Sequence, residues 1–207
     1  MAKKIKGTVT FNNKPNTVDD FFTTTGLTED SVSSVTLDVM ANDGNGKNNT
    51  NTLWSLDDSI STGGNQPDDL LDEDIGRTAA TSTDRSAHGA TIWITPAGTI
   101  GYDPSTHSAA FKAQLQSLNP GETLTDSFTY AILLVNGTLK WATATVQIAG
   151  VNDAPVAQAA GFSVAEDAAL VAGAVIATDV DNGATRSFAL NTPAPAGLTF
   201  NSDGRYT

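Results

Sequence analysis

The sequence contains no cysteine, and this absence excludes several kinds of site. Without thiols the chain has no disulfide bonds, no cysteine-ligated zinc and no cysteine nucleophile. A secreted domain that lacks disulfides needs another source of stability, either a large core or a bound metal ion. Because the chain is rich in Asp and Asn, an oxygen-ligated calcium ion is the natural candidate.

Basic residues are also scarce. The chain has 11 Lys and Arg against 23 Asp and Glu, which gives a formal net charge of −12. Nucleic-acid binding draws most of its affinity from Lys and Arg, so we expect no nucleic-acid partner. An anionic membrane surface is disfavoured in the same way unless a divalent cation intervenes. The imbalance indicates a metal-loaded or strongly solvated surface.

Long apolar runs are missing as well. No run reaches the roughly 18 apolar residues of a membrane-spanning helix, so we expect no direct membrane insertion. The weakly polar stretch 168–177 is expected to form a buried strand. The first residues are basic but no apolar segment follows them, which does not fit a conventional signal peptide.

Catalytic motifs are equally lacking, and we expect the chain not to be an enzyme. Neither a Gly-x-Ser-x-Gly elbow nor a phosphate-binding glycine loop is present. The histidines, His88 and His107, have no metal-site spacing and are expected at the surface. Trp54, Trp93 and Trp141 lie in strand-like runs, which favours core packing over a role as sugar-stacking platforms.

What the chain does contain is typical of an all-β protein. Two β-rich runs, 127–135 and 138–148, flank Asn136-Gly137, which favours a two-residue type I′ turn. Along the second run, apolar residues alternate with polar ones, as in a half-buried strand. One short helix is expected after Asp103-Pro104, because Phe111, Leu115 and Leu118 share a helical face. It should lie against the sheets as a connector.

Parts of the sequence occur twice. Glu29 precedes Asn42 by 13 residues, and Glu166 precedes Asp179 by 13 residues. Further on, 94–100 matches 200–206, with Gly98 aligned to Gly204. The second copy reaches Thr207 without a counterpart of the helix and closing hairpin.

These features predict a division into a tail at 1–17, a complete domain at 18–149, a linker at 150–157 and half a domain at 158–207. Half a domain exposes strand edges, so we expect residues after about 160 to be partly disordered or completed by another copy. The complete domain contains an acidic insertion at 57–89, interpreted as a long surface loop. Asp68–Asp74 within it has five acids in seven positions and is either a solvated insertion or a second ion site.

Several of these stretches resemble a known family. The segments 118–130, 150–157, 165–167 and 177–185 are similar to VCBS and cadherin-like repeats of type I-secreted bacterial surface adhesins. The resemblance implies an all-β fold, a Greek-key cadherin-like (Ig-like) β-sandwich, with one complete domain and a truncated second one.

The resemblance also implies a function. It is that of a calcium-dependent adhesion or extender module of a secreted bacterial surface or biofilm protein. The partners would be other cadherin-like repeats or cell-surface components. Two alternatives stay open: a calcium-dependent lectin for acidic exopolysaccharide, as in Rhizobium-adhering-type proteins, and a non-catalytic accessory module of a larger secreted protein.

The same resemblance implies a Ca²⁺ site at the linker, with ligands from both domains. Its candidate ligands are Glu29, Asp103, Asn152, Asp153, Asp179 and Asp181, of which Asp103 matches least well. The alternative interpretation is that these Asp and Asn residues only form turns. The chain departs from the cadherin linker at Gly150, which replaces the first Asp, and the linker is one residue shorter.

Overall fold

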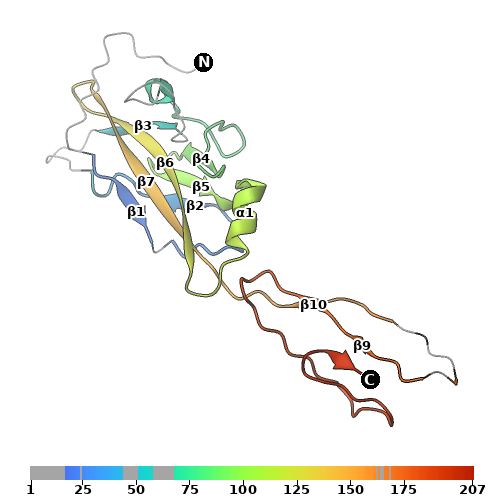
Figure 1. The fold of residues 1–207 in the computed structure, drawn as a ribbon. Coiled ribbons are helices and arrows are strands. Elements are labelled where there is room, and N and C mark those ends of the chain that lie inside the picture. The colour runs from blue at the N-terminus through green and yellow to red at the C-terminus, as the bar shows by residue number, and fades with distance from the viewer. Residues whose placement is uncertain are drawn as a thin grey trace.

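The first part of the chain forms two β-sheets around one core (Figure 1). The computed structural model describes residues 17–23, 25–43, 51–57, 68–161, 163, 166–167 and 169–207. One sheet has the strand order β1-β7-β6-β3, built from Asp20–Phe22, Leu139–Ala149, Thr123–Leu133 and Thr52–Asp57. The other has the order β2-β5-β4, built from Val35–Leu37, Ile100–Asp103 and Thr91–Ile94. Strands dominate and helices are few, so the all-β prediction is confirmed.

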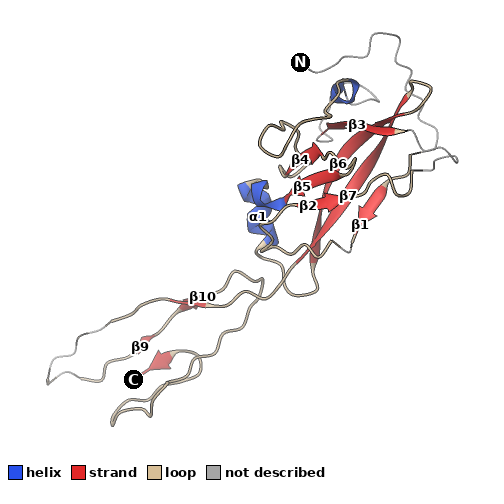
Figure 2. Cartoon of the chain, turned by 180° about the vertical axis from the view of Figure 1, so that it is seen from behind, coloured by secondary structure: helices blue, strands red, loops and turns tan. Residues whose placement is uncertain are grey.

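The central element is the long hairpin of β6 and β7 (Figure 2). Its strands pair without interruption from Thr123–Ala149 to Leu133–Leu139. The turn is longer than the predicted two-residue turn, because the N–H of Leu134 donates to the carbonyl of Thr138 and the N–H of Gly137 to that of Leu134. Gly137 has a φ of 81°, as expected at the end of a three-residue hairpin loop.

The core lies between the two sheets and takes apolar side chains from both. The expected alternation along β7 is confirmed, since its core-facing residues are buried: Ala142, Ala144, Val146 and Ile148. The opposite sheet contributes Ile92, Ile100 and Tyr102, all fully buried. A shared apolar core of this kind holds the two sheets together.

The predicted helix is present as α1 (Ala109–Leu115), next to the short 3-10 helix η2 (Pro104–Thr106). The side chain of Ser108 caps α1 by accepting a hydrogen bond from the N–H of Phe111. Phe111 and Leu115 are buried against the sandwich, and Leu118 is buried just after the helix ends. The helix therefore lies against the sandwich, as predicted, and its buried side chains are part of the core.

The C-terminal part extends beyond the end of β7 as an elongated pair of ribbons (Figure 1). Its strands have two residues each: β8 (Val156–Ala157), β9 (Gly173–Ala174), β10 (Ala177–Thr178) and β11 (Arg205–Tyr206). β8 pairs with β10, and β9 with β11. The expected buried strand at 168–177 is wrong where the structure describes it, because Leu170 is 82% exposed and Ile176 is 55% exposed. Among the described residues, no second sheet packs over Leu170 and Ile176.

One turn recurs in both parts of the chain. The N–H of Thr95 donates to the carbonyl of Thr99, and the N–H of Asn201 to that of Arg205. Each turn is closed by a glycine, Gly98 or Gly204, with a positive φ. Strand pairing follows in each case, and Phe200 lies opposite Tyr206 as Ile94 lies opposite Ile100.

Candidate functional site

Glu29 is placed by a segment that runs beside the end of β7. Thr28 forms a parallel bridge with Ala149, and the N–H of Glu29 donates to the carbonyl of Ala149 at 3.0 Å. The side chain then accepts a hydrogen bond at Oε1 from the N–H of Val151, at 2.7 Å. Glu29 is thus anchored where the chain leaves the sandwich.

Asp153 and Asp181 come from the segment after β7 and from the loop after β10. They are joined by a hydrogen bond from the N–H of Asp153 to Oδ2 of Asp181, at 3.0 Å. The loop is also tied to the sandwich, because the N–H of Asn182 donates to the carbonyl of Ser117 at 3.1 Å. These contacts bring residues from distant parts of the sequence to one point.

The side chains of Glu29, Asp153 and Asp181 form a cluster that could hold a metal ion. One carboxylate oxygen from each lies within 4.8 Å of the others. Three oxygens are buried without a hydrogen-bond partner: Oε2 of Glu29, Oδ2 of Asp153 and Oδ1 of Asp181. Asp181 is only 8% exposed. Buried carboxylate oxygens without partners are costly, so their convergence fits a cation.

The electrostatics of the cluster point the same way. Burial raises the pKa of Glu29, and the neighbouring carboxylates of Asp153, Asp30 and Asp181 raise it further. Burial also raises the pKa of Asp153, together with the charges of Asp30, Asp181 and Asp179. Like charges at this distance repel one another, and a bound cation would reverse that repulsion.

The other predicted ligands lie outside the cluster. Asp179 is adjacent to it and accepts a hydrogen bond from the N–H of Asp181 at 3.2 Å. Asn152 is exposed, and its side-chain amide donates to the carbonyl of Asp153. Asp103 instead caps η2, since its Oδ1 accepts from the N–H and the hydroxyl of Ser105. An N-cap role accounts for Asp103 without a metal.

Asp30 was not among the predicted ligands, although it raises the pKa of Asp153. The signal that could have identified it is its position next to Glu29. The departure at Gly150 also has a physical reason. A Cβ atom at this position would overlap Leu118 and the carbonyl of Asn119, so an aspartate does not fit there.

The acidic insertion is folded onto the sandwich where the structure describes it, and the prediction of a plain surface loop is wrong there. It contains the 3-10 helix η1 (Asp68–Leu71), whose Leu70 is fully buried. Asp74 is 3% exposed and accepts at Oδ2 from the N–H of Leu56 in β3. Residues 70–74 of the acidic run are therefore buried or half-buried and do not form an exposed loop.

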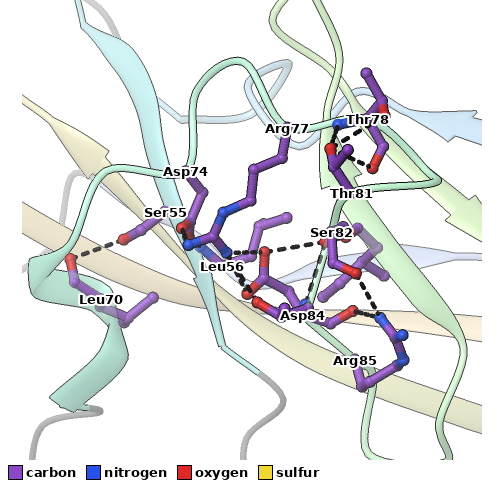
Figure 3. A network of polar contacts seen from close by, with 12 residues as sticks. Ser55, Leu56, Leu70, Asp74, Arg77, Thr78, Thr81, Ser82, Asp84 and Arg85 are labelled. Atoms are coloured by element: carbon purple, nitrogen blue, oxygen red, sulfur yellow. Dashed lines mark hydrogen bonds and ion pairs between the residues drawn. The ribbon is translucent and has the colours of Figure 1, made fainter. Parts of the chain in front are cut away.

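Arg77 lies between Asp74 and Asp84 and supplies a positive charge to both (Figure 3). Its guanidinium contacts Asp74 Oδ1 at 2.8 Å and both carboxylate oxygens of Asp84 at 2.8 Å. Burial raises the pKa of Asp74 to about 7, partly offset by the N–H of Leu56 and by Arg77. An internal cation thus already compensates these acids.

The prediction that both histidines lie at the surface is wrong for His107, which is 5% exposed. Its Nε2 lies 3.1 Å from Oδ2 of Asp126 and 2.7 Å from the hydroxyl of Tyr102. His88 is half-buried and stacks on Phe111 with the ring centroids 3.9 Å apart. The imidazole of His107 can be buried because Asp126 of β6 provides a hydrogen-bonding partner. The spacing of the histidines in the sequence does not reveal that partner.

The tryptophans differ in burial. Trp54 is 6% exposed, in agreement with the predicted core role. Trp93 and Trp141 are half-buried. Trp93 lies over Gly101 of the neighbouring strand, and a Cβ atom at Gly101 would overlap the indole.

Comparisons with known proteins and a search for membrane-spanning helices complete the description of the chain. In the part of the chain that the structure describes, no helix is long and apolar enough to cross a membrane. No protein-family model matches the chain, and no curated protein matches it significantly.

Proposed function

We propose that the chain is a calcium-dependent extracellular adhesion or extender module of a bacterial surface protein. In this proposal Ca²⁺ binds between Glu29, Asp153 and Asp181 and stiffens the junction between two cadherin-like repeats. The observation that carries the proposal is the convergence of three buried carboxylate oxygens that have no hydrogen-bond partner. The site is proposed to bind an ion and not to catalyse a reaction.

The donor atoms favour calcium over other metals. All three side chains offer oxygen, and the cluster contains neither a histidine nor a thiolate. Calcium binds oxygen at about 2.3–2.6 Å, so ligands on opposite sides of the ion lie about 4.6–5.2 Å apart. The oxygens of the cluster, within 4.8 Å of one another, need little movement to reach such distances. Water molecules and the nearby carboxylate of Asp30 would complete the coordination.

The origin of the ligands explains how an ion would act mechanically. Glu29 belongs to the sandwich, Asp153 to the segment that leaves it, and Asp181 to the loop beyond β10. A metal that bridges these segments would convert their mutual repulsion into a crosslink. The part beyond Asp153 would then keep one direction relative to the sandwich, as an extender requires. Its partners would be other cadherin-like repeats or cell-surface components.

The first test is thermal unfolding of the chain in EDTA, in millimolar calcium and in millimolar magnesium. Extracellular calcium modules bind at about 10⁻⁴–10⁻³ M, so we expect calcium to add roughly 1–3 kcal/mol and raise the Tm by several degrees. Magnesium should do much less, because its shorter bonds require a tighter site.

Two variants and a control sharpen this test. Glu29→Gln and Asp181→Asn should each remove most of the calcium-dependent shift. Asp167→Asn is the matched control, because Asp167 is an exposed acid that follows Glu166 as Asp30 follows Glu29. A calcium shift that survives both Glu29→Gln and Asp181→Asn would refute this site.

A further inference from the structure

A second acidic cluster surrounds the hydroxyl of Tyr130. This hydroxyl lies 2.8 Å from Oδ2 of Asp20, 2.9 Å from Oδ2 of Asp43 and 3.2 Å from the carbonyl of Val39. Tyr130 is fully buried, and Asp43 and Asp20 are 2% and 8% exposed. A phenol has one proton and can donate to only one of these acceptors. At least one buried carboxylate therefore faces the cluster without a proton donor from Tyr130.

No described residue supplies a positive charge to Asp20 or Asp43. Oδ1 of Asp43 accepts from the N–H of Val18 at 2.8 Å. Burial is the largest influence on the pKa of both carboxyl groups. Tyr130 and the charge of Asp19 also act on both. The amide of Asn42 acts on Asp20, and the N–H of Val18 acts on Asp43. Among the described residues, none of the groups that influence them is a cation. The strand that pairs with β1 presents only Ala144, Thr145 and Val146 opposite it.

We propose that Asp20 and Asp43 share one additional proton, and that this proton makes them a pH-sensitive clasp for the N-terminal strand β1. One carboxyl group stays protonated and donates to the oxygen of Tyr130, while Tyr130 donates to the other carboxylate. The clasp joins the segment that carries β1 to the loop after β2, through Tyr130 in β6. Loss of the shared proton leaves two buried anions competing for one phenol proton, which weakens the attachment of Val18–Phe22.

The direction of the pH effect follows from the same geometry. Burial and the charge of Asp43, opposed by the hydrogen bond from Tyr130, raise the pKa of Asp20 to about 6. Burial likewise raises the pKa of Asp43. When β1 detaches, both groups return to the ordinary range near about 4. The form with β1 attached therefore binds more protons than the form with β1 detached. The clasp is strongest in acid and weakens as the pH rises toward about 6.

The direct test is ¹³C NMR titration of the side-chain carboxyl carbons in the full chain. We expect the Asp20–Asp43 pair to titrate in two coupled steps, one of them near pH 6. This measurement needs no substitution, so a failure to fold cannot obscure it. Titration of both carbons in the ordinary range, near about pH 4, would overturn the proposal.

A second test follows the amide of Val18 by hydrogen exchange, since this amide donates to Asp43. Its protection factor should fall by up to about tenfold per pH unit between about pH 4 and 6 and then level off. Asp20→Asn supplies a permanent donor and should abolish this slope. Asp38→Asn changes an exposed acid whose Oδ1 accepts from the N–H of Met40, and it should keep the slope. Equal slopes in Asp20→Asn and the unmodified chain would contradict the shared proton.

Discussion

At the scale of single residues, burial decides the role of an acidic side chain in this protein. Asp126 is 1% exposed and accepts hydrogen bonds from the N–H groups of His88 and Ser127 and from several side chains, Tyr102 and His107 among them. Asp103 accepts at Oδ1 from the N–H and the hydroxyl of Ser105 and so caps η2. Asp181 has one satisfied oxygen and one without a partner. Only this last arrangement points to a ligand.

Replacing Asp126 should reveal how far its charge stabilises the fold. Burial alone would raise the pKa of Asp126, but hydrogen bonds from His107, Ser86 and Tyr102 outweigh it and lower the pKa below the usual range. Stability from this group is thus present at neutral pH and lost as the pH falls through the lowered value. Asp126→Asn should cost about 3 kcal/mol or more at pH 7 in urea unfolding. The difference in the free energy of unfolding between the variant and the unmodified chain should shrink in strong acid. A difference that does not change with pH would show that the charge of Asp126 does not stabilise the fold.

At the scale of elements, the pairing of β4 with β5 depends on a glycine beneath a tryptophan. Gly101 lies opposite Trp93, and a Cβ atom there would meet the indole ring. We expect Gly101→Ala to destabilise the fold by about 1–3 kcal/mol, because the indole must move away from the sheet. Urea unfolding measures the cost, and tryptophan fluorescence should report the displaced ring.

A double-mutant cycle separates this overlap from other effects of the substitution. In the Trp93→Ala background, where the ring is absent, Gly101→Ala should cost little. An equal cost in both backgrounds would mean that backbone conformation, and not the indole, requires glycine at this position.

At the scale of the whole molecule, a calcium ion at the proposed site would control the direction in which the C-terminal part extends. A compact chain of 207 residues would have a radius of gyration of about 17 Å. The elongated arrangement in Figure 1 predicts a clearly larger value in calcium. In small-angle scattering we expect EDTA to broaden the distribution of distances, because the segment after β7 can then bend. Asp181→Asn should give the EDTA profile in both buffers, and identical profiles with and without calcium would rule out a stiffening role.

Much of the fold could be predicted from the sequence because its signals are local. The alternation from Ala142 to Ile148 indicates a strand, and the helical spacing of Phe111 and Leu115 indicates a helix. Errors arose where a distant partner changes the environment. His107 is buried because Asp126 and Tyr102 surround it. The acidic insertion folds onto β3 because Arg77 and the N–H of Leu56 compensate Asp74.

By itself, the sequence determined that this protein is built from strands, lacks thiol chemistry and carries a strong negative charge. Those properties follow from composition and from side-chain periodicity, which each short segment already contains. Only the tertiary structure decided which acidic side chains lie close together. It joined Glu29, Asp153 and Asp181, and it gave Asp103 a cap instead. Ligand geometry depends on contacts between residues that are more than 100 positions apart, such as the hydrogen bond between Val151 and Glu29, and no local pattern encodes those distances.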